Sequence, residues 1–113
     1  NGLPRGCSDD EFPWVREAEN ILDTKYPYVV HAETNAIQNR NIVSLEGCKL
    51  YNTLFPCNNC AKDIIQAGIE EVIYFSDKYH DTNESVASRR MLDAAKVNYR
   101  QYQGQLKEIK LIF

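Results

Sequence analysis

The chain has 113 residues, of which 43% are hydrophobic and 26% are charged. These values are typical of one soluble globular domain, so extensive disorder and a second domain are not expected. Sixteen acidic and 13 basic residues give a net charge of −3, which disfavours a strongly basic nucleic-acid-binding protein. No apolar run approaches the roughly 20 residues that a membrane-spanning helix needs. We therefore expect a soluble, cytoplasmic protein in which residues 1–113 form a single domain.

The N-terminal part of the chain is predicted to hold a loop followed by two helices. Residues 1–13 contain two glycines and two prolines, a composition that favours a loop. Apolar residues at helical spacing predict a short amphipathic helix from Trp14 to Leu22. Pro27 interrupts this pattern, because the residue before a proline avoids the helical conformation. A second helix is expected from Glu33 to Arg40.

The rest of the chain alternates between predicted strands and helices. In order, we expect a turn over 45–47, a strand over 49–55, a helix over 57–67, a strand over 71–75, a helix over 84–95, and strands over 97–102 and 109–113. Gly68 is placed to end the helix over 57–67. The helix over 84–95 is expected to turn Ala87, Met91, Leu92 and Ala95 toward the interior. The strand over 71–75 is apolar enough to be central in a sheet. This order of elements predicts an α/β fold with parallel strands.

Two short motifs carry side chains that bind metal ions. The first is His31-Ala32-Glu33, and the second is Pro56-Cys57-Asn58-Asn59-Cys60. Each lies at or just before a predicted helix start, where the positive end of the helix dipole favours a thiolate over a thiol. Cys57 and Cys60 are three residues apart and share one helix face. Both sulfurs and the His31 imidazole can therefore bind one zinc ion.

Three protein ligands leave the fourth tetrahedral position of zinc for water, which is typical of a catalytic site. Zinc lowers the pKa of such a water to about 7, and Glu33 is placed to move protons beside it. Two alternatives stay open from the residues alone. The first is a structural zinc site closed by Cys7, Cys48, His80 or a carboxylate, and the second is a histidine beside a redox-active C-x-x-C. Glu33 could likewise be a solvated glutamate that only favours the helix start.

Together the motifs match H-x-E…P-C-x-x-C, the known signature of zinc-dependent nucleobase deaminases. Longer blocks extend the similarity over nearly the whole chain, and they resemble the deoxycytidylate (dCMP) deaminase family. These blocks are NGLPRGCSD (1–9), KYPYVVHAETNAI (25–37), LFPCNNCAK (54–62) and SDKYHD (76–81).

The resemblance implies a three-layer α/β/α cytidine-deaminase-like fold with a mixed central sheet. It also implies an enzyme that hydrolyses dCMP to dUMP and ammonia with zinc as cofactor, and so feeds thymidylate synthesis. By position, it assigns zinc binding to His31, Cys57 and Cys60, the proton shuttle to Glu33, and substrate binding to Asn1 and Tyr79.

The resemblance further implies partners besides the substrate. Family members are typically homo-oligomers, often hexamers, that dCTP activates and dTTP inhibits. The residues that match the effector-binding part are Gly2, Gly6, Ser8, Asp9 and Asn35. Acidic residues 9–11 are expected to form a solvated face or a cap, and alternatively to hold Mg²⁺ together with an effector. Neither a nucleic-acid polymer nor a membrane is an expected partner.

The chain departs from the family pattern at its start. Family members have an N-terminal helix and two strands before the residue that matches Asn1, and these segments supply basic residues near the substrate phosphate. We therefore expect the chain to be an N-terminally incomplete domain with an incomplete phosphate-binding set. Two other functions stay open: deamination of another cytosine nucleoside or nucleotide, and a catalytically inactive family member that senses nucleotides.

Overall fold

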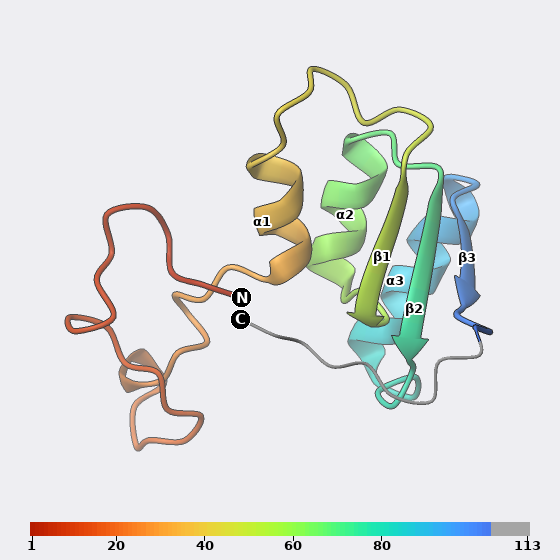
Figure 1. Cartoon of the computed structure of the whole chain (residues 1–113). Helices are drawn as coiled ribbons and strands as arrows, with labels where there is room; N and C mark the ends of the chain where they lie inside the picture. Colours follow the sequence, from red (N-terminus) through yellow and green to blue (C-terminus); the bar gives the residue numbers. More distant parts are fainter. Residues whose placement is uncertain (105–113) are drawn as a thin grey trace.

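Three parallel strands form the sheet of this protein in the computed structural model, which describes residues 1–104 (Figure 1). The strands are β1 (Lys49–Leu54), β2 (Glu71–Ser76) and β3 (Asn98–Gln101), in the order β1-β2-β3. The prediction that residues 71–75 form a central strand is confirmed within this sheet. The strand expected over 109–113 lies outside the described residues.

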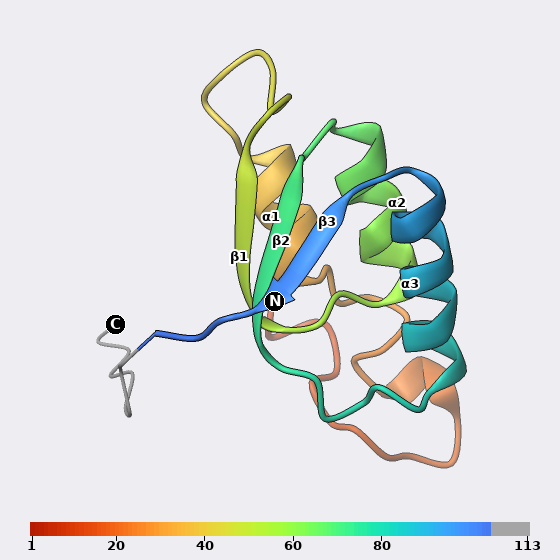
Figure 2. The same cartoon turned by 90° about the vertical axis from the view of Figure 1, so that its right-hand side faces the viewer.

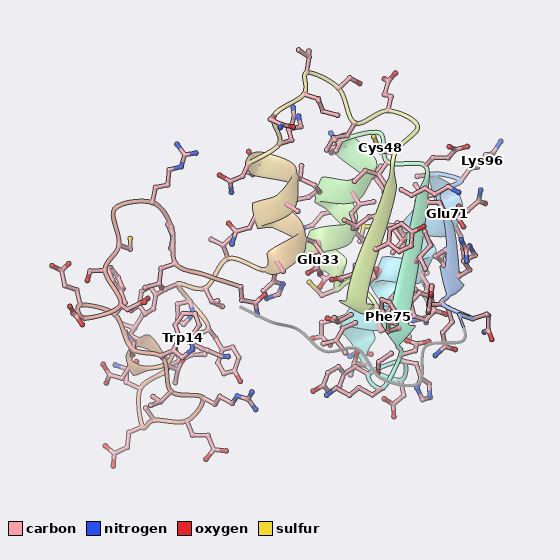
Figure 3. All side chains as sticks on the ribbon, viewed as in Figure 1. Trp14, Glu33, Cys48, Glu71, Phe75 and Lys96 are labelled. Carbon is pink, nitrogen blue, oxygen red and sulfur yellow. The ribbon has the colours of Figure 1, made fainter. Side chains whose placement is uncertain are left out.

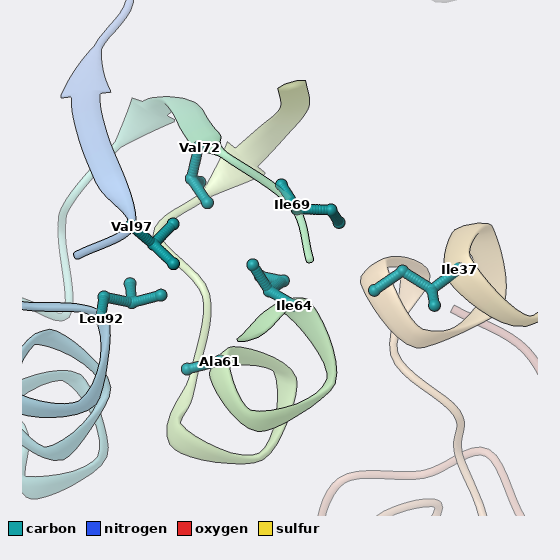
Figure 4. Packing of buried hydrophobic residues seen from close by; sticks show 7 residues of the cluster. All are labelled: Ile37, Ala61, Ile64, Ile69, Val72, Leu92 and Val97. Atoms are coloured by element: carbon teal, nitrogen blue, oxygen red, sulfur yellow. The ribbon is translucent and has the colours of Figure 1, made fainter. Parts of the chain in front are cut away.

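Three α-helices alternate with the strands: α1 (Ala32–Gln38), α2 (Asn58–Gln66) and α3 (Asn83–Ala94). α2 links β1 to β2 and α3 links β2 to β3, and right-handed crossovers place both helices on one face of the sheet (Figure 2). α1 packs beside α2 in the same layer (Figure 4). The α/β class with parallel strands is confirmed, whereas the antiparallel strands and second helical layer of the expected fold are not among residues 1–104. No helix in this region is long and apolar enough to cross a membrane.

The hydrophobic core lies between the sheet and the layer of helices (Figure 4). Its buried members are Ile37, Ala61, Ile64, Ile69, Val72, Leu92 and Val97. The parallel register places Leu50, Val72 and Tyr99 side by side on the sheet face that packs against the helices. Full burial of a branched side chain contributes roughly 1.5–3 kcal/mol. α2 contributes two residues to this core, Ala61 and Ile64, whereas α1 and α3 contribute one each, Ile37 and Leu92.

Local sequence explains where the helices begin and end. The Oγ1 of Thr82 accepts a hydrogen bond from the Ser85 amide at 3.2 Å and so caps α3. Gly68 follows α2 with a φ of 78°, and a Cβ at this position would lie 2.8 Å from Glu46 Cγ, so glycine is required. The helices predicted over 33–40, 57–67 and 84–95 are confirmed, each shifted by no more than two residues at either end.

The predicted inward face of α3 is only partly correct. Ser85, Ser88 and Leu92 are buried, whereas Ala95 is exposed at the end of the helix. The reason is that α3 rests on α2 along a stripe with spacings of three and four residues that begins at Ser85. Two of the buried positions in this stripe are serines. A prediction based on hydrophobicity therefore chose neighbouring alanines instead.

The α-helix predicted from Trp14 to Leu22 does not form. A single 3-10 turn, η1 (Ile21–Asp23), is present instead, and the Asn20 side chain caps it by accepting a backbone hydrogen bond. Trp14 is 48% exposed and Ile21 is 65% exposed. Figure 3 shows Trp14 in a loop that extends away from the sheet. A short helix is stabilised mainly by packing of its apolar face, and this segment has nothing to pack against among the described residues.

Candidate active site

Three metal-binding side chains meet at the start of two helices. The donor atoms of His31, Cys57 and Cys60 all lie within 4.8 Å of one another. The Nδ1 of His31 is 3.3 Å from Cys60 Sγ and 3.5 Å from Cys57 Sγ. The structure therefore brings together the three residues that the sequence singled out, although 26 residues separate His31 from Cys57 along the chain.

The backbone around each motif explains this meeting. His31 is the residue before α1 and Cys57 is the residue before α2, and both have extended backbone conformations. Buried Pro56 lies between the end of β1 and Cys57, where the chain leaves the strand and enters α2. Cys60 follows in the first turn of α2 and is 1% exposed. Because α1 packs beside α2, the Nδ1 of His31 lies within 3.5 Å of both sulfurs.

The two cysteines share one proton unequally. A hydrogen bond from the Cys60 thiol, aided by the backbone amides of Cys60 and Asn59, lowers the pKa of Cys57 to about 5 even though burial opposes this change. Retention of the shared proton, together with burial, raises the pKa of Cys60 well above its usual range. Cys57 is therefore a thiolate at neutral pH, which is the form that binds metal ions.

Two sulfurs and one imidazole nitrogen form a donor set typical of zinc, with one coordination position left for water. Among the residues that the structure describes, no fourth His, Cys, Asp or Glu joins the group. A closed structural site completed by Cys7, Cys48 or His80 therefore has no support. The three side chains fit a catalytic zinc ion.

The metal-binding group opens into a cavity of about 410 Å³ at the carboxyl ends of β1 and β2. Ligands of parallel α/β proteins commonly bind at this end of the sheet. Predicted site residues that line the cavity are Asn1, His31, Glu33, Cys57 and Tyr79. Figure 3 shows Glu33 at the start of α1, close to the carboxyl end of β1. One cavity thus joins the metal-binding group, the expected proton shuttle and both residues expected to bind substrate.

The two residues expected to bind substrate differ in how firmly they are held. The Oδ1 of Asn1 accepts a hydrogen bond from the Ala32 amide at 2.8 Å, which ties the chain start to the first turn of α1. Tyr79 lies in the turn after β2 and is 57% exposed. The Nζ of Lys78 is 5.1 Å from the centre of the Tyr79 ring, within the range of a cation–π contact. Asn1 is fixed in place, while Tyr79 lies open at the cavity mouth.

Only two of the residues expected to bind effectors come together. Gly2 pairs with Val30 in an antiparallel bridge, and a Cβ at Gly2 would lie 3.6 Å from the Asn35 amide nitrogen. The other three, Gly6, Ser8 and Asp9, are exposed in the loop that follows. Of these five residues, none lines the 410 Å³ cavity.

Arg89 is a structural residue of this cavity that the sequence did not reveal. Its guanidinium group forms an ion pair with Asp77, donates a hydrogen bond to Ser85 and lies 3.8 Å above the Phe55 ring. Asp77, Ser85 and Phe55 all line the cavity: Asp77 directly follows β2, Phe55 directly follows β1, and Ser85 lies in α3. No spacing rule connects Arg89 with these positions, and nothing in the sequence distinguishes it from Arg90. Arg89 contacts lining residues but is not one of them, and the lining residues without a sequence signal are Asn52, Thr82 and Glu84.

Known proteins are similar to this chain over the part that contains the candidate site. Residues 13–76, which include all three metal-binding residues and Glu33, match the family model of the cytidine and deoxycytidylate deaminase zinc-binding region. The deoxycytidylate deaminase of Homo sapiens is 57% identical over all 113 residues, and the probable deoxycytidylate deaminase of Drosophila melanogaster is 53% identical over 118 aligned residues. The deoxycytidylate deaminase of Enterobacteria phage T4 is 51% identical over 47 residues, which are 40% of this chain and 24% of that protein. The chain spans 64% of the human protein and 58% of the fly protein.

Proposed function

Because this chain belongs to the cytidine and deoxycytidylate deaminase family, we propose that it catalyses the zinc-dependent hydrolysis of dCMP to dUMP and ammonia. One observation carries the proposal: His31, Cys57 and Cys60 meet in one group, and two of them, His31 and Cys57, line a cavity that Glu33 also lines. The name of the human relative, deoxycytidylate deaminase, supports dCMP as the substrate.

The reaction adds the oxygen of water to C4 of the cytosine and releases the amino group as ammonia. The water must lose its protons, while N3 and the departing amino group must each gain one. A bound zinc ion would supply a water that is activated at neutral pH. We assign the proton transfers to Glu33, which lines the cavity: it would take the first proton from the attacking water, deliver it to N3, and then pass the second to the amino group.

The cavity size and its side chains suit a mononucleotide. A volume of about 410 Å³ falls within the range of small-ligand sites, and a nucleic-acid polymer would need a long basic channel instead. We expect the Asn1 amide to bind a sugar hydroxyl or a phosphate oxygen, and the Tyr79 ring to contact the nucleotide at the cavity mouth. Lys78 is the only lysine or arginine among the lining residues in the described part of the chain.

Regulation and assembly form a second part of the proposal. As in the family, dCTP and dTTP would act as effectors of a homo-oligomer, and the proximity of Gly2 to Asn35 outside the cavity supports a separate effector site. Among the described residues, acidic residues 9–11 do not gather into a metal-binding group, so Mg²⁺ has no support. A hexameric state and a cytoplasmic location stay predictions. Size-exclusion chromatography with light scattering, with and without each nucleotide, tests the oligomer.

Chromatographic separation of dCMP from dUMP tests the enzymatic proposal directly. Zinc-loaded protein is incubated with dCMP, CMP, deoxycytidine and cytidine in parallel, and we expect dUMP to form fastest. Turnover of another cytosine compound but not of dCMP would contradict the proposed substrate. Nucleotide-dependent changes in oligomer size without any ammonia would instead identify an inactive nucleotide sensor.

A further inference from the structure

A partly buried hydrogen bond joins the two helices that carry the metal-binding residues. The hydroxyl of Thr34 on α1 donates to the Oδ2 of Asp63 on α2 at 2.6 Å. The two residues are 29 positions apart in the chain and both side chains are partly buried. A short bond to a carboxylate is among the stronger hydrogen bonds in proteins. This contact therefore fixes how the two helices sit against each other.

The bond lies one helical turn behind the metal-binding group. Thr34 follows His31 by three residues, and Asp63 follows Cys60 by three, so each partner shares a helix face with a metal-binding residue. The Oγ1 of Thr34 is 4.0 Å from Cys60 Sγ. Any change in the Thr34–Asp63 distance would consequently move the His31 imidazole relative to the Cys60 sulfur.

Few other contacts hold α1 in place. The helix has seven residues, and Ile37 is the only one that is buried. Cys60, Ala61 and Ile64 of α2, in contrast, are fully buried in the interior. α2 is thus the more deeply buried of the two helices. α1 is held on it by Ile37, the metal-binding group and the Thr34–Asp63 bond, while Asn1 ties the first turn of α1 to the chain start.

The bond also determines which acceptor receives the hydroxyl proton of Thr34. A hydroxyl has one proton, and here the carboxylate of Asp63 receives it. Thr34 therefore cannot donate to the nearby Cys60 sulfur while this bond exists. The lone pairs of that sulfur stay available for a metal ion.

We propose that Thr34 and Asp63 are a positioning pair that sets the spacing between the His31 helix and the Cys57–Cys60 helix, and so determines zinc affinity and coordination geometry. This inference rests on zinc binding at the site, which is part of the proposed function. Partners that orient metal-binding residues typically change metal affinity by about 10- to 100-fold when they are removed.

Metal binding by the full chain tests the pair. Thr34→Val removes the hydroxyl at nearly constant shape, Thr34→Ser retains it, and Gln66→Ala on the exposed end of α2 is the matched control. A competing chromogenic chelator gives the Kd for Zn²⁺, and the absorption spectrum of bound Co²⁺ reports the ligand geometry. We expect Thr34→Val to raise the Kd about tenfold or more and to change the Co²⁺ spectrum, while Thr34→Ser and Gln66→Ala stay within about threefold of the unsubstituted chain.

A Thr34→Val chain that binds Zn²⁺ within twofold of the unsubstituted chain, with the same Co²⁺ spectrum, would overturn the proposal. Equal losses in Thr34→Val and Thr34→Ser would do the same, because the hydroxyl would then not be responsible. If Thr34→Val does not fold, the same measurements compare Asp63→Asn with Asp63→Leu. The asparagine side chain can still accept the Thr34 proton, whereas leucine cannot. For the proposal to stand, the Asp63→Asn chain must bind Zn²⁺ at least fivefold more tightly than the Asp63→Leu chain.

These readouts separate the positioning pair from the proposed reaction. Variants that change the Zn²⁺ Kd as expected in a chain that never deaminates dCMP would leave the pair intact and refute the substrate. Normal dCMP turnover with a Kd that does not respond to Thr34 or Asp63 would refute the pair alone.

Discussion

The side chain of Asn1 and the backbone amide of Ala32 are joined by a hydrogen bond of 2.8 Å across 31 positions of the chain. His31 precedes α1 but makes no capping hydrogen bond with its own side chain. Asn1 therefore satisfies an amide of the first helical turn that the local sequence leaves free. The same side chain lines the cavity, so it has both a structural and a ligand-binding role to test.

Substitution of Asn1 separates these two roles. Asn1→Ala removes the acceptor and should lower the free energy of unfolding by about 0.5–2 kcal/mol, as for loss of a helix cap. Asn1→Asp keeps an acceptor for Ala32 but loses the amide donor, so it should retain stability and raise KM for dCMP. Urea denaturation and steady-state kinetics measure the two effects. Equal KM values for Asn1→Asp and the unsubstituted chain would contradict a substrate contact.

Glu33→Gln should abolish proton transfer without removing a metal-binding residue. General acid–base catalysis typically contributes about 10²- to 10⁴-fold, so we expect kcat to fall by at least that range. Zinc content, measured by atomic absorption, should stay at the level of the unsubstituted protein. A Glu33→Gln enzyme with full kcat would show that another group moves the protons.

The metal-free chain should show a pH-dependent reactivity at Cys57. With Cys7→Ser and Cys48→Ser as background, iodoacetamide reports the Cys57 thiolate. Because the pKa of Cys57 is lowered to about 5, the alkylation rate should be flat from pH 7 to pH 6 and fall as the pH drops through 5. Cys60→Ala removes the largest cause of the lowered pKa and should move this midpoint upward. A rate that still rises between pH 7 and pH 9 would contradict the assignment.

Arg89 should affect substrate binding but not metal binding. Arg89→Gln breaks the ion pair with Asp77 and the contact with the Phe55 ring, so the cavity wall loosens. We expect KM for dCMP to rise about tenfold, which corresponds to about 1.4 kcal/mol, with an unchanged Kd for Zn²⁺. Arg90→Gln, at the exposed neighbouring position, is the matched control and should change neither value. Equal KM values for the two variants would rule out this role.

Substitution of buried Ser88 should raise the free energy of unfolding, whereas most substitutions at buried positions lower it. Its side chain is fully buried, and its hydroxyl has no hydrogen-bond partner among the described residues. Ser88→Ala removes this unsatisfied group and adds helix propensity, so it should raise the free energy of unfolding by about 1 kcal/mol. Ser85→Ala, three positions earlier, removes the partner of Arg89 and should be destabilising. Urea denaturation of both variants compares the signs, and a destabilised Ser88→Ala would indicate that the hydroxyl is satisfied.

The sequence predicted those elements whose determinants are local. Gly68 follows α2 with a positive φ that favours glycine, and Pro56 follows the end of β1; both effects can be read from residue type. The segment from Trp14 to Leu22 has an equally good helical pattern but forms no α-helix. Its outcome depends on a packing surface, which no local pattern records.

The same distinction holds within the candidate site. The motif spacing and the family resemblance identified His31, Cys57 and Cys60, and the structure shows that they meet; their roles stay predictions. The contacts of Arg89 with Phe55 and Asp77 depend on how α3 lies against the sheet. Asp77 and Phe55 are 12 and 34 positions away from Arg89 in the chain, and the fold brings them together although no spacing rule predicts it. Supporting residues of this kind are therefore missed when only motifs are read.

With zinc bound as proposed, the shallow attachment of α1 would link the lifetime of the protein to the supply of zinc. An element with one buried side chain opens locally at a much lower free energy than the rest of the fold, and a ligand that binds only the closed form suppresses this opening. In metal-poor conditions, the segment around α1 would therefore be more open to proteases than in the zinc-bound protein. Cells short of zinc would then lose molecules of this protein as well as its activity, and restoring the metal would not recover the activity until new chains had been made.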